Sequence, residues 1–139
     1  MLDLNFSSRV PGKNASEELR ASRITQTVRS FKEASKFFSS RGSVVRVTLD
    51  GEEIGRARIT DISKKIKLTE LEQFDAEIGG FSSVKELQNA LKRAGFRFKA
   101  LYEYYGIKIQ FLFVDEDGKL TPEIEVLRRT SQVKQEFGT

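Results

Sequence analysis

The chain has 139 residues, with 24 Lys and Arg against 20 Asp and Glu, and it has neither Cys nor His. That length suits one domain with its own core, and the composition excludes thiolate and imidazole metal sites and every nucleophile or base built on Cys or His. Residues 1–6 carry a carboxylate where a secretion signal needs an apolar run, and residues 111–114 are too few to cross a bilayer. We expect a cytoplasmic protein without a membrane segment.

The first forty residues predict short elements. Residues 2–6 alternate between apolar and polar side chains, which indicates a first strand that Pro11-Gly12 ends. Asn14 or Ser16 is a suitable cap for a short helix over 17–19. The β-branched run 24–29 predicts a strand or extended segment, and 33–38 predicts one or two helical turns.

The clearest β pattern is a hairpin over residues 43–62. Asp50-Gly51 is a type I′ turn sequence, because glycine tolerates the positive φ that this turn requires. The alternation gives each strand an apolar face, and the opposite face carries Arg46, Arg56 and Arg58. Whether these arginines align across the turn depends on the strand register, which the sequence leaves open.

Two helices and a long strand follow. Residues 69–72 have capping-box spacing, with apolar side chains at 68, 71 and 74 on one face. Ser83 and Glu86 form a second capping box before an apolar stripe over 84–94, and Gly95 is placed to end that helix. Residues 105–114 alternate and predict a strand. Helices inserted between strands favour an α+β fold, either a mixed sheet or a small β-barrel with two to four flanking helices.

Six segments, read in chain order, carry a family resemblance: residues 4–6, 25–29, 41–45, 55–62, 80–87 and 105–113. The most recognisable is the helix start over 80–87, which is similar to a G-F-x-S-x-x-E-L motif. Residues 25–29 resemble the end of a K-T-x-T-[IV]-R segment. Together the six resemble the ASCH domain, a branch of the PUA-like folds. The resemblance implies a small mixed or antiparallel β-barrel over residues 1–114, with 115–139 as a C-terminal extension, and an RNA-related function.

One enzymatic branch of that family hydrolyses N4-acetylcytidine. The resemblance implies that this chemistry uses a Lys and a Thr of the K-T-x-T-[IV]-R segment and a Glu just before the Gly-Phe helix start. Thr27 and Arg29 match the segment, but the Lys position holds Ile24 and the Glu position holds Gly79. Neither replacement can activate a hydroxyl or transfer a proton, so we expect binding rather than hydrolysis.

Two nearby residues are possible substitutes in an enzyme. Arg23 stays protonated and is a poor base, and Glu77 serves only if the loop shifts its alignment. If the protein is an enzyme, Thr27 and Glu77 are the candidate catalytic residues. A nuclease with a metal on the carboxylates of 115–117 is a further alternative, although a solvated turn before Gly118 explains these acids better. We expect no metal and no cofactor.

The binding hypothesis needs cations for phosphates and planar groups for unstacked bases. It predicts RNA, single-stranded or structured, as the partner. The candidate contacts are Arg23, Thr27, Arg29, Arg46, Arg56, Arg58, Lys64, Lys65, Arg97, Lys99 and Tyr102. The alternative interpretation of the cations is a solubilising surface, and for Arg29 it is a pair with a buried carboxylate that organises the cleft. Phe37 and Phe38 are both expected in the core.

A protein-interaction module in a transcription or translation complex is the third class of function. Apolar residues in the extension over 115–139 suit packing on the barrel or on a second copy, so a homodimer is possible. Salt separates these classes, because RNA binding weakens steeply with added salt.

Overall fold

The computed structural model describes residues 1–10, 12–96 and 104–115. The described elements alternate short helices with strands. In chain order they are β1 (Asp3–Phe6), α1 (Gly12–Arg20), β2 (Gln26–Arg29), α2 (Phe31–Ala34), the 3₁₀ helix η1 (Ser35–Phe37), β3 (Val44–Leu49), β4 (Glu52–Ile62), β5 (Ile66–Lys67), the 3₁₀ helix η2 (Leu68–Glu70), α3 (Gln73–Ile78), α4 (Val84–Arg93) and β6 (Tyr105–Val114).

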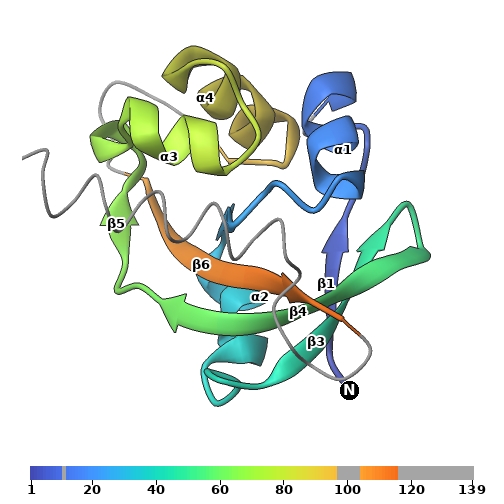
Figure 1. Cartoon of the computed structure of the whole chain (residues 1–139). Helices are drawn as coiled ribbons and strands as arrows, with labels where there is room; N and C mark the ends of the chain where they lie inside the picture. Colours follow the sequence, from blue (N-terminus) through green and yellow to red (C-terminus); the bar gives the residue numbers. More distant parts are fainter. Residues whose placement is uncertain (11, 97–103, 116–139) are drawn as a thin grey trace, which may run out of the picture.

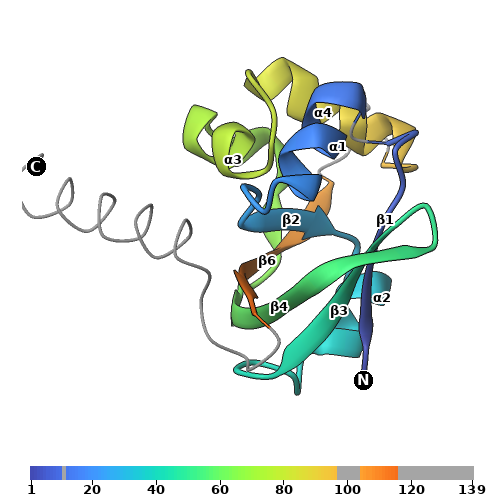
Figure 2. The ribbon, with the colours of Figure 1, turned by 45° about the vertical axis from the view of Figure 1, so that its right-hand side comes forward.

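The strands form one curved mixed sheet in the order β1-β3-β4-β6-β2, with β5 paired to β6. β1 runs parallel to β3, and the other pairs are antiparallel. The sheet curls into a half-barrel, with α1, α3 and α4 gathered at one end and α2 at the other (Figures 1 and 2). The predicted α+β small barrel with two to four flanking helices is therefore confirmed, with four α-helices among the described residues.

The hairpin between β3 and β4 forms as predicted. Asp50 and Gly51 have φ of 52° and 84°, as a two-residue turn with positive φ at both positions requires. The register places Arg46 opposite Arg56 and Val44 opposite Arg58, so the three arginines share the outer face. The arginines of the two strands therefore align across the turn, which the sequence alone left open.

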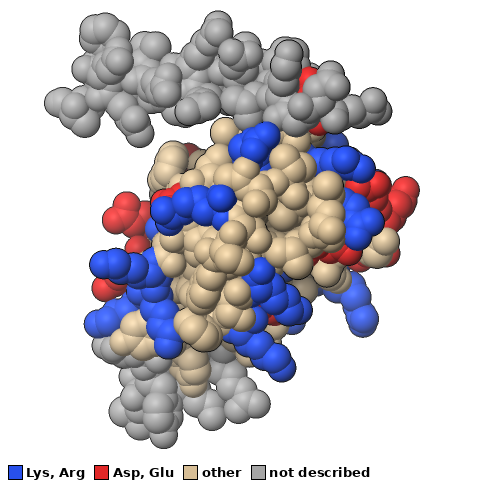
Figure 3. Space-filling view, turned by 90° about the horizontal axis from the view of Figure 1, so that it is seen from below, with Lys and Arg blue, Asp and Glu red and all other residues tan. Residues whose placement is uncertain are grey.

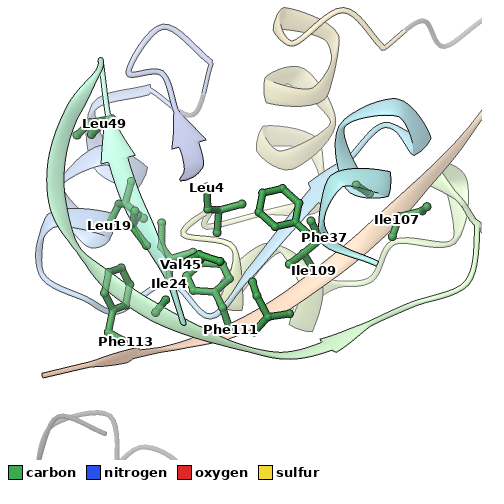
Figure 4. Close-up of a cluster of buried hydrophobic side chains, with 14 residues drawn as sticks. Leu4, Leu19, Ile24, Phe37, Val45, Leu49, Ile107, Ile109, Phe111 and Phe113 are labelled. Atoms are coloured by element: carbon green, nitrogen blue, oxygen red, sulfur yellow. The ribbon is translucent and has the colours of Figure 1, made fainter. Parts of the chain in front are cut away.

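The main core fills the concave side of the sheet. It includes Leu4 of β1, Val47 of β3, Ile59 of β4 and Phe111 of β6, all fully buried (Figure 4). β6 contributes alternate residues to this core from Ile107 to Phe113, as its pattern predicts. A second, smaller cluster joins α3 and α4 to the sheet and contains Leu68, Leu71, Ala76, Leu87 and Leu91.

Helix α4 has the ends that its sequence predicts. The Ser83 hydroxyl accepts a hydrogen bond from the Glu86 amide at 3.2 Å, and Gly95 adopts a φ of +104° after the last turn. Leu87, Ala90 and Leu91 form its buried stripe. Because α4 is fixed at both ends, its C-terminal residues have a defined position beside the site described below.

Three local predictions are wrong. Helix α1 begins at Gly12, so Asn14 and Ser16 both lie inside it and neither is its cap. The predicted helix over 68–74 splits into η2 and α3, because Leu71 is extended and Glu72 caps α3 in a capping box with Asp75, which leaves Phe74 62% exposed. Phe38 is 45% exposed, whereas Phe37 is buried as expected.

In the part of the chain that the structure describes, no helix has the length and apolar character needed to span a membrane.

Candidate functional site

A pocket of about 250 Å³ opens beside the edge strand β2. Its walls come from the end of β1, from α1, from β2, and from α3 and α4. Most of the lining is apolar, and the polar side chains come chiefly from β2, α2 and α3. The lining residues are Asn5, Phe6, Ser7, Val10, Ala15, Leu19, Ile24, Gln26, Thr27, Val28, Arg29, Glu33, Asp75, Gly79, Phe81, Leu87, Ala90, Leu91, Ala94 and Phe96.

Arg29 lies on the edge strand β2 and contacts the other edge strand, β1, beside this pocket. Its Nε donates to the Thr27 hydroxyl at 3.0 Å, and its Nη1 lies 3.3 Å from the Glu33 carboxylate. Its guanidinium carbon lies 4.7 Å from the centre of the Phe6 ring on β1. Desolvation lowers the pKa of Arg29 and Glu33 opposes that change, but a guanidinium stays charged in either case. The pocket therefore has a fixed positive group in its wall.

The expected pairing of Arg29 with a carboxylate is present, but the partner differs from the expectation. Glu33 is 55% exposed, so it is a surface carboxylate and not a buried one. Its position on α2, four residues after Arg29, gives the pair a helix-like spacing.

A second polar group lies where α3 meets the sheet. The Asp75 carboxylate, only 8% exposed, accepts hydrogen bonds from Gln26 Nε2 at 3.0 Å and from the Glu72 amide at 2.9 Å, and it lies 2.8 Å from Lys108 Nζ. Gln26 in turn accepts from Gln110 at 3.2 Å. Desolvation raises the pKa of Asp75, but its three donors together hold that pKa below the ordinary value. Asp75 is therefore an ionised group in the pocket wall.

The three positions that correspond to the hydrolase motif come together in this pocket. Ile24, Thr27 and Gly79 all line it. Ile24 is 2% exposed and packs against Gly80, where an added Cβ atom would lie 2.7 Å from Ile24 Cδ1. Glu77, the possible substitute, lies on the exposed side of α3 beside Gln73 and does not line the pocket. The two positions that the resemblance assigns to the Lys and the Glu thus lie in the pocket lining, where Ile24 and Gly79 carry no acid–base group.

The other predicted RNA contacts fall in separate places. Arg23 is exposed and pairs with Glu18 at 3.0 Å. On the hairpin, Arg46 pairs with Asp3 at 2.6 Å, Arg56 lies 3.6 Å from Glu53, and Arg58 donates to the Gly42 carbonyl at 2.6 Å. Lys64 and Lys65 are exposed in the loop between β4 and β5. Among the predicted contacts that lie within the described residues, only Thr27 and Arg29 line the pocket.

Part of the prediction lies outside the described residues. Arg97, Lys99 and Tyr102 fall there, as do the acids at 116 and 117 and the extension beyond residue 115. Within the described residues, no group of three or more Asp and Glu side chains is placed to hold a metal ion.

Sequence reasoning missed the polar residues that the fold gathers from distant segments. Gln26, Asp75 and Lys108 have no shared motif, and Phe6 was read only as part of a strand. The one available signal for a polar site was the carboxylate of Asp75, which directly follows the last apolar position of the predicted helix.

The fold is similar to that of a solved ASCH domain. The structure is similar to an ASCH domain from Lactobacillus crispatus JV V101, with a TM-score of 0.55 and 15% sequence identity over 78% of this chain and 79% of that chain. It is also similar to a protein of Enterococcus faecalis V583 from the DUF984 family, with a TM-score of 0.57 and 13% identity over 83% of this chain and 77% of the other. No family model and no curated protein matches the sequence. At these identities the likeness establishes the fold alone.

Proposed function

We propose that this protein binds RNA and that the pocket beside β2 holds one unstacked base. The pocket carries the proposal, because it combines a mostly apolar lining with polar side chains that include Thr27 and Arg29. A cavity of about 150 Å³ takes one benzene ring, so a pocket of about 250 Å³ accommodates one heterocyclic base. Sequence-specific RNA recognition mostly uses bases that are out of the stack and bonded along their edges.

Exposed cations are next in sequence to the pocket lining, and in this proposal they supply the phosphate contacts. Arg9 and Arg93 precede Val10 and Ala94, which line the pocket. Arg93 also donates to the Val10 carbonyl at 2.9 Å, which places its charge beside the loop after β1. A nucleotide whose base enters the pocket would therefore have positive charge near its flanking phosphates.

The polar groups in the pocket suit binding better than hydrolysis. Asp75 is held ionised by its donors, so it is a poor proton donor, and Lys108 is engaged by the same carboxylate. Ile24 and Gly79 occupy the positions from which the hydrolase branch would draw its Lys and Glu. We expect no turnover of N4-acetylcytidine.

Blocking the pocket tests the proposal. Ala94 is exposed and lines the pocket, so Ala94→Trp fills the pocket without altering the core. The matched control is Asn89→Trp, which adds the same ring to an exposed position of α4 that does not line the pocket. We expect Ala94→Trp to weaken binding of single-stranded RNA at least about tenfold, or about 1.4 kcal/mol, and Asn89→Trp to leave it unchanged.

Fluorescence anisotropy with single-stranded, duplex and hairpin RNA measures this at about 50 and 200 mM salt, where phosphate contacts give a steep loss of affinity. Absence of RNA binding at the lower salt concentration would contradict the proposed function. Equal affinities for the two tryptophan variants would contradict the assignment to the pocket.

A further inference from the structure

Two phenylalanine rings are exposed side by side on the segment formed by α2 and η1. Phe31 is 52% exposed and Phe38, which follows the buried Phe37, is 45% exposed. Their ring centres lie 5.5 Å apart in an edge-to-face arrangement with an interplanar angle of 70°. We call this pair the Phe31–Phe38 platform. Its rings support each other and leave aromatic surface in contact with water.

One lysine lies over this platform, and three more exposed lysines belong to the elements that carry it or to the β4–β5 loop. Lys65 Nζ lies 4.8 Å from the centre of the Phe31 ring, and the exposed Lys32, Lys36 and Lys64 belong to α2, η1 and the β4–β5 loop. Within residues 1–10, 12–96 and 104–115, none of these four lysines forms an ion pair. In the described part of the chain, therefore, no ion pair with a carboxylate neutralises these lysines.

Figure 3 views the molecule from the side on which α2 lies in Figure 1. Lys and Arg side chains border a broad area of uncharged residues on this face, and Asp and Glu side chains lie toward its edges. A polyanion with apolar, planar groups complements such a surface better than a neutral or cationic protein does.

We propose that the Phe31–Phe38 platform stacks bases of single-stranded RNA while Lys32, Lys36, Lys64 and Lys65 contact its phosphates. Exposed aromatic rings with cations around them are the arrangement by which proteins hold unpaired strands, since every base has a π face. Lys65 covers one side of Phe31, but its flexible stem lets the amine move from the ring to a phosphate. This inference rests on the proposed RNA binding and adds a second contact surface to it.

The platform is within reach of the same strand that enters the pocket. Arg29 and Glu33 line the pocket, and Phe31 lies between them in sequence at the start of α2. Residues two apart on a helix point to different sides. One side of α2 thus contributes to the pocket and another side carries the platform, so one RNA strand could pass from the first to the second around this helix.

Removing the rings tests the inference. The double variant Phe31→Ala with Phe38→Ala takes away the platform, and both positions are exposed. Phe74→Ala is the matched control, because Phe74 is 62% exposed on α3, at the other end of the half-barrel (Figure 1). Anisotropy measures binding of an oligouridylate of about 15 nucleotides, and NMR titration measures binding of a trinucleotide. We expect the double variant to bind the long strand at least about fivefold more weakly, as loss of one stacked base predicts, and to bind the trinucleotide as the wild type does.

A second variant keeps both rings. Lys64→Glu with Lys65→Glu is expected to weaken binding of the long strand and to reduce the salt dependence of its affinity, because two phosphate contacts are lost.

The outcomes separate the two proposals. If the long strand binds the Phe31→Ala/Phe38→Ala and Phe74→Ala proteins equally well, the platform is wrong and the pocket stands. If Ala94→Trp has no effect and the double Phe variant does, the pocket is wrong and the platform stands. Failure of the wild type to bind either RNA overturns both. An anionic membrane surface is the alternative ligand of the platform, and sedimentation with phosphatidylserine vesicles tests it. If the double Phe variant loses vesicle binding but keeps wild-type RNA binding, the platform binds membranes and the proposal is overturned.

Discussion

Asp75 is nearly enclosed, and its charge is balanced by donors from three different segments. Gln26 belongs to β2, Lys108 to β6, and the Glu72 amide to the start of α3. Replacing the carboxylate with an amide removes the partner of Lys108, whose side chain is 27% exposed. Because an uncompensated, partly buried charge is costly, we expect Asp75→Asn to lower the free energy of unfolding by about 1–3 kcal/mol, measured by urea denaturation.

The ion pair between Arg41 and Asp61 provides the control for that experiment. Its two atoms are 2.7 Å apart, but both side chains are more than half exposed. Asp61→Asn should therefore cost less than about 1 kcal/mol. Equal effects of the two substitutions would contradict the role given to Asp75.

At the scale of single residues, the sequence predicted the site residues that belong to one short motif. Thr27 and Arg29 were identified as site residues because they match the segment that resembles K-T-x-T-[IV]-R, and both line the pocket. Asp75 and Lys108 were not, because the contact between them depends on how α3 settles on β6. Arg46, Arg56 and Arg58 align as a hairpin face, but their contribution to RNA binding stays a prediction.

Among the secondary-structure elements, β5 and β6 meet at a glycine that has no room for a side chain. A Cβ atom at Gly106 would lie 2.8 Å from Leu68 Cδ2 and 2.9 Å from Val28 Cγ1, both within or beside the second hydrophobic cluster. Gly106→Ala therefore forces these side chains apart. We expect a loss of about 1–3 kcal/mol in unfolding free energy, the usual cost of overpacking, measured by thermal or urea denaturation.

Gly55 on β4 is the comparison, since an added Cβ atom there would lie 3.4 Å from the Phe113 ring. Gly55→Ala should change stability by less than about 1 kcal/mol, because alanine also reduces the entropy of the unfolded chain. If Gly106→Ala is as mild as Gly55→Ala, the close packing of β6 against η2 and β2 is not as tight as described.

Elements with strong local patterns were predictable and those shaped by packing were not. The β3–β4 hairpin, α4 and β6 match their expectations because turn glycines, capping residues and alternation all agree. β5 was not predicted, since two residues carry no periodicity and its pairing depends on β6. Phe74 was placed in the core because the interruption at Leu71 does not show in the apolar spacing.

The stability of the whole molecule should depend on pH through Asp75. Its pKa is lower in the folded protein than in the unfolded chain, so the unfolded state takes up a proton first as the pH falls. The stabilisation is therefore complete above the ordinary carboxyl pKa of about 3.9 and is lost as the pH drops below it. Urea denaturation from pH 7 down to pH 3 should show a smaller loss of stability for Asp75→Asn than for the wild type; equal losses would contradict this assignment.

The fold class was predictable as a whole, because helices inserted between strands favour a mixed sheet or small barrel, and the ASCH-like motifs occur in the same order. The shape of the pocket was not predictable from motifs. It depends on the curvature that brings β1 and β2 close enough for Arg29 to lie over Phe6, and curvature is a property of the whole sheet.

The strand order also has a consequence for synthesis on the ribosome. β2 pairs only with β6 among the described strands, and the side chains of Gln26 and Gln110 that meet there are 84 positions apart. A nascent chain therefore carries an unpaired β2 until β6 has been synthesised, and neither the half-barrel nor its pocket can close until β6 has left the exit tunnel. Long-range pairing of this kind slows folding and leaves strand edges exposed, so chains that end before β6 should be substrates for chaperones and proteases.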